Sequence, residues 1–186
     1  MIPEYLDKSP LGKAPALETS EGFISESLAI LEYIERAYPE HSLLPATPFD
    51  IAKVQELSQF IELYLELVAR RLIPNLLGRT EPDPVVLKDV EKSLSKAVDG
   101  LAKLSSFEQF AYGDKFTQAD IAAILNVPIV RSVGKAFMDR DFLSGVPGLN
   151  DYLLRMEERP HVKKVGSDAA SDRPGFMAHL KALYGM

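Results

Sequence analysis

Residues 9–34 read SPLGKAPALETSEGFISESLAILEYI, and the spacing of apolar residues changes within this stretch. Two short extended runs, 14–19 and 23–25, flank a turn signal at Ser20-Glu21-Gly22, which predicts a β-hairpin. Pro15 has no N–H to donate to a strand ladder, so it should lie at the start or the edge of its strand.

A helix should follow the hairpin, because from Ser27 onward apolar residues recur at helical spacing. Tyr38-Pro39 should end this helix. Ahead of the hairpin, residues 1–13 indicate a short helix or turn that finishes at Ser9-Pro10-Leu11-Gly12. After the helix, residues 39–50 (PEHSLLPATPFD) hold three prolines and no helical period, which is typical of a linker between domains.

The chain after residue 50 is predicted to be helical throughout. Pro74 should end or kink the first of these helices. Thr117 is a good N-cap, and Asp120 stands at the third helical position of a capping box in which Asp replaces Glu or Gln. Besides the helix that Thr117 begins, helices are expected at 50–77, 84–105, 147–158 and 175–184.

Composition narrows the class of protein. Of 186 residues, 46% are hydrophobic and 26% charged, as in ordinary globular proteins. The formal net charge of -6 and the pI of about 5.2 make nucleic acid and anionic membrane surfaces poor partners. No apolar run reaches about 18 residues and the N-terminus does not resemble a secretory signal, so we expect no membrane association and a cytoplasmic location.

The inventory of reactive side chains is also limited. The absence of cysteine excludes disulfides, thiolate metal ligands and a cysteine nucleophile. The three histidines, His41, His161 and His179, do not have the i, i+4 spacing of a helical zinc site, so no metal site is expected. An X-Pro pair at a strand start and a Glu-Ser pair at a helix start do not by themselves identify a ligand.

Three motifs, taken together and in this order, resemble those of cytosolic glutathione transferases. Residues 9–18 (SPLGKAPALE) are similar to the N-P-x-G-x-V-P-x-L turn of that family. Residues 26–34 (ESLAILEYI) resemble its E-S-x-A-I-x-x-Y-L segment, and residues 113–122 (GDKFTQADIA) resemble its G-x-x-x-S/T-x-A-D capping box. The three motifs together span most of the chain.

The resemblance implies a mainly α fold in two domains. A partial thioredoxin-like α/β domain, formed by a β-hairpin and a helix, is expected over 1–39. A linker over 40–49 and an all-α C-terminal helical bundle over 50–186 should follow it.

The resemblance also implies that glutathione is bound as a co-substrate. The family's proline at the Pro15 position is cis, so that Ala14 offers its N–H and C=O to the cysteinyl part, as one strand pairs with another. Ser27 and the helix N-terminus would hold the γ-glutamyl carboxylate. Glu26 would hold the α-amino group, and Lys13 would reach the glycyl carboxylate.

No catalytic residue is assigned. In the family, the activating Ser, Tyr or Cys lies at the end of a first strand, within a strand-helix-strand unit of about 30 residues that precedes the turn. Only eight residues precede Ser9, so we expect this unit to be missing and the thioredoxin-like domain to be truncated. Neither Ser9 nor Tyr5 lies in the element that carries the family's catalytic group.

Two functions therefore remain open. In its intact form the protein would conjugate glutathione to a small electrophilic substrate; alternatively, it is a non-catalytic interaction or dimerisation module. The resemblance also implies a homodimer, in which the thioredoxin-like part of one subunit packs on the helical part of the other, with a two-fold, isologous interface.

Overall fold

The computed structural model describes the backbone of residues 3–184. Its contacts divide the chain into two compact units, residues 1–51 and residues 52–186. The fold is mainly helical with one small antiparallel sheet, which confirms the expected fold class.

The first unit is built around a hairpin. It contains the helix α1 (Pro3–Leu6), the strands β1 (Ala16–Thr19) and β2 (Gly22–Ser25), the helix α2 (Ser27–Ala37) and the 3-10 turn η1 (Pro39–His41). In the register of the hairpin, Ala16 pairs with Ser25 and Thr19 pairs with Gly22. The Thr19 hydroxyl closes the two-residue turn, because it donates to the Gly22 carbonyl at 2.9 Å and accepts from the Glu21 N–H at 3.2 Å.

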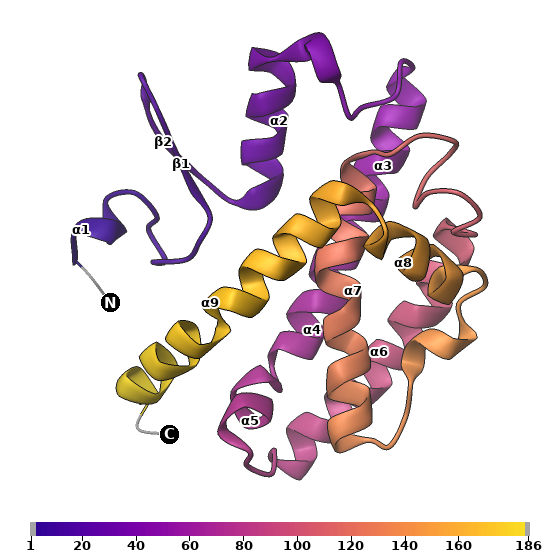
Figure 1. The fold of residues 1–186 in the computed structure, drawn as a ribbon. Helices are drawn as coiled ribbons and strands as arrows, with labels where there is room; N and C mark the ends of the chain where they lie inside the picture. The colour runs from indigo at the N-terminus through magenta and orange to yellow at the C-terminus, as the bar shows by residue number, and fades with distance from the viewer. Residues whose placement is uncertain (1–2, 185–186) are drawn as a thin grey trace. The chain divides into compact units, whose positions relative to one another are not determined.

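The second unit is a helical bundle. Its elements are α3 (Pro48–Phe60, which begins in the first unit), the π-helical segment η2 (Ile61–Glu66), α4 (Leu67–Arg70), α5 (Ile73–Gly78), α6 (Pro84–Leu104), α7 (Gln118–Phe137), the 3-10 turn η3 (Phe142–Gly145), α8 (Leu149–Glu157) and α9 (Pro160–Tyr184). Figure 1 shows α4, α6 and α7 side by side, and η2 packs on both α6 and α7. The core lies where these helices meet, with Ile61, Leu65, Leu94 and Val127 fully buried.

The expected helix over 50–77 is wrong in its detail. It begins at Pro48, passes through a π-helical segment and ends at Arg70. Pro74 does not kink it but lies in the first turn of the separate helix α5. A proline fits there without loss, because the first N–H groups of a helix have no partner within the helix.

The expected last helix over 175–184 is also wrong, because α9 starts at Pro160 and continues through Pro174. Pro160 suits a helix start, where its fixed φ matches the helical value. The residues around Pro174 are exposed, so water reaches the carbonyl group that the proline ring leaves without a partner. The helix expected at 147–158 is present as α8 and starts two residues later, after Gly148 with φ +71°.

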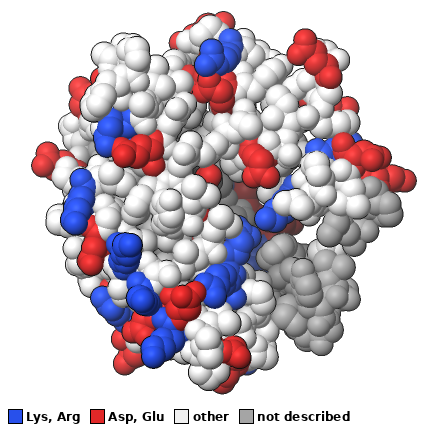
Figure 2. Space-filling model, turned by 180° about the vertical axis from the view of Figure 1, so that it is seen from behind, with Lys and Arg blue, Asp and Glu red and all other residues white. Residues whose placement is uncertain are grey.

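Charged residues of both signs lie interspersed on the face seen from behind in Figure 2. Several charged residues of the second unit form ion pairs, such as Arg71 with Asp89 at 2.6 Å. Exposed pairs of this kind contribute at most about 1 kcal/mol each to stability. They therefore affect solubility more than they determine the fold.

Candidate functional site

The hairpin brings the predicted site residues together. Because Ala16 pairs with Ser25, the residues that lead into β1 and those that follow β2 leave the ladder at the same end. Ala14 and Pro15 are on one strand of this open end, and Glu26 and Ser27 are on the other. Two pairs that lie twelve residues apart in sequence are thus neighbours across the hairpin.

The first side of the open end is an exposed stretch of backbone. The Ala14–Pro15 peptide bond is cis, as the resemblance implied. Ala14 is exposed, and within residues 3–184 neither its N–H nor its C=O has a hydrogen-bond partner. An unpaired N–H and C=O on one residue is the arrangement that a peptide ligand uses when it pairs with a strand edge.

The second side is the N-terminus of α2. Ser27 is the first helical residue, and Glu26 precedes it with φ 73° and ψ 122°. A left-handed φ is unfavourable for glutamate, and such strain is concentrated at ligand sites. The first intrahelical bond runs from the Ile30 N–H to the Glu26 carbonyl, so the N–H groups of Ser27 to Ala29 remain available to an anion.

The charged side chains at this end are both exposed. Neither Lys13 nor Glu26 takes part in an ion pair with another described residue. The site therefore offers backbone donors, one hydroxyl, one cation and one carboxylate to a ligand. A zwitterionic peptide with carboxylates at both ends has the complementary groups.

Two residues with no role expected from the sequence, Ser9 and Tyr5, lie beside the site. The Ser9 hydroxyl is buried and accepts from the Lys13 N–H at 3.1 Å, while the Tyr5 hydroxyl donates to the Lys13 carbonyl at 3.2 Å. The Ser-Pro-x-Gly turn followed by lysine was the only signal in the sequence, since it places a serine four residues before Lys13.

The polar interactions of the second unit are structural. Asp120 is fully buried and accepts from the Ala111 N–H at 2.8 Å, the Thr117 N–H at 2.8 Å and the Tyr152 hydroxyl at 2.9 Å. The predicted capping box is present. Burial raises the pKa of Asp120, while its hydrogen bonds act in the opposite direction. Every oxygen of this carboxylate is used by the protein itself, so it is not a ligand site.

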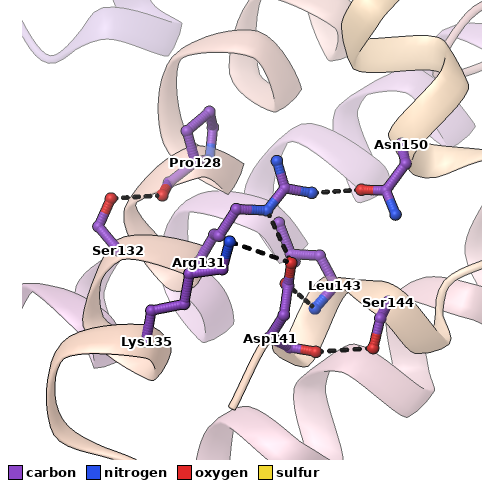
Figure 3. A network of polar contacts seen from close by, with 8 residues as sticks. All are labelled: Pro128, Arg131, Ser132, Lys135, Asp141, Leu143, Ser144 and Asn150. Carbon is purple, nitrogen blue, oxygen red and sulfur yellow. Dashed lines mark hydrogen bonds and ion pairs between the residues drawn. The ribbon is translucent and has the colours of Figure 1, made fainter. Parts of the chain in front are cut away.

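A second polar network joins α7, η3 and α8 (Figure 3). Arg131 contacts Asp141 at 3.1 Å and also bonds to Asn150, and Lys135 lies 4.0 Å from the same Asp141 carboxylate. Asp141 in turn caps η3 by accepting from the Leu143 N–H at 3.0 Å. The side chains in this network are bonded to one another, which marks it as a structural joint between helices.

The described residues contain neither a metal site nor a membrane-spanning helix. No group of three or more histidine, aspartate or glutamate side chains has the arrangement of a metal site in this part of the chain. None of the helices described has the length and apolar character needed to cross a membrane.

Comparison with known proteins gives consistent results. The family model for the glutathione S-transferase N-terminal domain matches residues 2–42. A glutathione S-transferase of Pseudomonas putida is 35% identical over 180 residues, which cover 97% of this chain and 82% of that protein. Probable elongation factor 1-gamma 2 of Arabidopsis thaliana is 29% identical over 90% of this chain, which spans only 40% of that factor.

A solved structure shows the same fold. Glutathione S-transferase 1-6 from Anopheles dirus species B superposes with a TM-score of 0.75 and 21% identity. The superposition covers 95% of this chain and 80% of the Anopheles protein.

Proposed function

The chain belongs to the glutathione S-transferase family, and on that premise we propose that it binds glutathione at the open end of its hairpin. The observation that carries the proposal is the β1–β2 register, which makes Ala14-Pro15 and Glu26-Ser27 neighbours. Each pair supplies a different kind of group, and together they match the groups of a γ-glutamyl tripeptide.

Each residue has a role in this proposal. Ala14 pairs through its N–H and C=O with the cysteinyl residue of glutathione. The N–H groups at the start of α2 and the Ser27 hydroxyl donate to the γ-glutamyl carboxylate, where the helix dipole also favours negative charge. Glu26 accepts from the α-amino group, and Lys13 contacts the glycyl carboxylate.

Calorimetry with two serine variants tests the site. Ser27→Ala should weaken glutathione binding by about 1–3 kcal/mol, because a carboxylate loses a donor. Ser20 lies in the hairpin turn, at the opposite end of the strands, so Ser20→Ala is a matched control that should bind like the wild type. Equal affinities for the wild type and Ser27→Ala would remove Ser27 from the site.

On the basis of family membership, we propose that the protein conjugates glutathione to a small electrophile. The second candidate is a non-catalytic binding or dimerisation module. It is favoured because the two hydroxyl groups near the site, those of Ser9 and Tyr5, already form hydrogen bonds within the protein. Ser9 is only 2% exposed, and both Ser9 and Tyr5 are bonded to the Lys13 backbone, so neither is free to activate the glutathione thiol.

Turnover separates these two candidates. The chain is incubated with glutathione and an aryl halide, and thioether formation is followed by absorbance. Glutathione binding with conjugation above the uncatalysed rate supports the enzyme; binding without turnover supports the module. We also propose that the protein is located in the cytoplasm, and cell fractionation tests this location.

We also propose that the chain forms a homodimer in which its helical unit packs on the thioredoxin-like unit of a second copy. Leu63, Tyr64 and Leu67 are each about half exposed within little more than one turn of η2 and α4. A hollow of about 450 Å³ lies beside them, lined by residues of α3 and η2. Burial of such side chains against a second copy removes apolar area from water, which favours association.

Sedimentation over a dilution series measures this assembly. We expect the wild type to dissociate at micromolar concentration and Leu63→Glu to be monomeric throughout. Leu154 is 62% exposed on α8, so Leu154→Glu is a control that carries the same charge change. A wild type that is monomeric at its highest soluble concentration would contradict the dimer.

A further inference from the structure

Two side chains that precede the site in sequence form hydrogen bonds to the N–H and to the C=O of Lys13. Ser9 Oγ accepts from the Lys13 N–H at 3.1 Å, and the Tyr5 hydroxyl donates to the Lys13 carbonyl at 3.2 Å. We propose that Ser9 and Tyr5 are positioning residues that orient the Ala14 backbone for the cysteinyl part of a γ-glutamyl peptide. This inference rests on the proposed function and adds two residues to its site.

The argument depends on the planarity of the peptide bond. The Lys13 carbonyl and the Ala14 N–H belong to the same peptide group, which rotates as a unit. A hydrogen bond from Tyr5 to that carbonyl therefore also fixes the direction of the Ala14 N–H. The carbonyl and the N–H of a trans peptide point in opposite directions, so the N–H is directed away from Tyr5 and left for a ligand.

Ser9 fixes the preceding peptide in the same way. Ser9 is buried, with 2% of the residue exposed, so its hydrogen bond to the Lys13 N–H is protected from competition with water. With both Lys13 backbone groups occupied, Ala14 is the first residue after Lys13 whose N–H and C=O lack partners within residues 3–184. The two side chains thus leave the N–H and C=O of Ala14, rather than those of Lys13, available to pair with the ligand.

The holding residues are themselves immobilised by the turn that carries them. The N–H groups of Lys8 and Ser9 donate to the Tyr5 carbonyl at 3.1 and 2.9 Å, and the Gly12 N–H donates to the Ser9 carbonyl at 2.8 Å. The Lys8 ammonium lies 5.0 Å from the centroid of the Phe23 ring, which ties the turn to β2. A fixed donor and acceptor reduce the entropy that the site loses when a ligand binds.

A positioning role and a general stabilising role can be distinguished by the ligands whose affinity they change. Glutathione reaches Ala14 through its cysteinyl residue, whereas γ-glutamyl-methylamide ends before that residue and reaches only Ser27 and the start of α2. Loss of the Lys13 contacts should therefore weaken glutathione and leave the fragment unchanged. A stabilising role alone would weaken both ligands equally.

The experiment uses Tyr5→Phe and Ser9→Ala, each of which removes one hydroxyl and little volume. Glutathione affinity is measured by calorimetry, and fragment affinity by shifts of the Ser27 amide signal in NMR at millimolar concentration. Each variant should lose about three- to tenfold in glutathione affinity, the effect of one hydrogen bond, with fragment affinity unchanged. Tyr38 is 63% exposed, and Tyr38→Phe is the control expected to match the wild type.

The outcomes separate the two proposals. If both variants bind glutathione as tightly as the wild type does, the positioning role is overturned and the proposed function stays in place. The same holds if a variant loses affinity equally for glutathione and for the fragment. A wild type that binds neither ligand overturns the proposed function and the positioning role with it.

Discussion

In residues 1–51, Ile30 is the one apolar side chain among those described that is buried, whereas 26 are buried in residues 52–186. The two units therefore depend on different forces. The helical unit is stabilised by close packing of apolar side chains, which contributes roughly 25 cal/mol for each Å² removed from water. The hairpin unit depends on short-range hydrogen bonds such as those of Thr19, Ser9 and Tyr5.

The two units also differ in net charge. Residues 1–51 hold nine acidic and three basic residues, so they carry the whole net charge of -6. Residues 52–186 hold 18 of each sign and are neutral. The proposed ligand site therefore lies in the less densely packed unit, and stability and binding should respond to different substitutions.

The largest expected effect is that of Asp120→Ala. Loss of this carboxylate leaves the buried donors of Ala111, Thr117 and Tyr152 without their acceptor. We expect a loss of about 3–5 kcal/mol in unfolding free energy, because each unpaired buried donor costs 1–3 kcal/mol and the effects are not additive. Urea unfolding measures it, with exposed Asp114→Ala as the control.

Glutathione affinity of the folded Asp120→Ala protein should equal that of the wild type. If affinity falls in parallel with stability, the two units are not energetically separate and the comparison fails.

Gly148→Ala should have the next largest effect. Gly148 has φ +71°, and a Cβ there would lie against the Ser106 carbonyl oxygen. Strain and contact together should cost about 2–4 kcal/mol. Gly145 lies three residues away with open space around its Cβ position, so Gly145→Ala should leave the melting midpoint almost unchanged. Equal midpoints for the two variants would disprove the close approach.

Tyr152→Phe should cost about 1–2 kcal/mol at neutral pH, since it removes one buried hydrogen bond to Asp120. Burial and then the Asp120 charge raise the pKa of Tyr152 above its ordinary value of 10. The folded state therefore retains a proton that the unfolded state releases above pH 10. Wild-type stability should fall with rising pH by about 1.4 kcal/mol per unit more steeply than that of the variant.

Unfolding free energies of both proteins between pH 9 and 11 check this slope. Parallel curves for the wild type and Tyr152→Phe would mean that Tyr152 ionises as freely in the folded state as in the unfolded state.

Thr117→Ala should have the smallest effect, a loss of about 1 kcal/mol, which is the usual contribution of a helix N-cap. Asp120 keeps its bond to the residue 117 N–H in this variant, because that donor belongs to the backbone. Thermal melting measures the loss, and glutathione affinity should not change. A midpoint equal to that of the wild type would show that the Thr117 side chain contributes nothing to α7.

Much of the fold and of the candidate site was predictable from the sequence, because the signals were local. The hairpin, the start of α2 at Ser27 and the capping box at Thr117 each depend on residues within a few positions of one another. The cis bond before Pro15 followed from the resemblance. Such features are encoded by turn chemistry and helix capping, which a single window of sequence contains.

The tertiary structure decided what depends on distant residues or on competing local choices. Asp120 accepts from Tyr152 across 32 positions, and no window of sequence contains both. The break in the helix after Arg70 and the passage of α9 through Pro174 depend on packing and solvent exposure, which override local propensity. The hydrogen bonds of Tyr5 and Ser9 with the Lys13 backbone form only in the folded turn. A hydrogen bond needs the correct direction between donor and acceptor, and sequence spacing alone does not supply it.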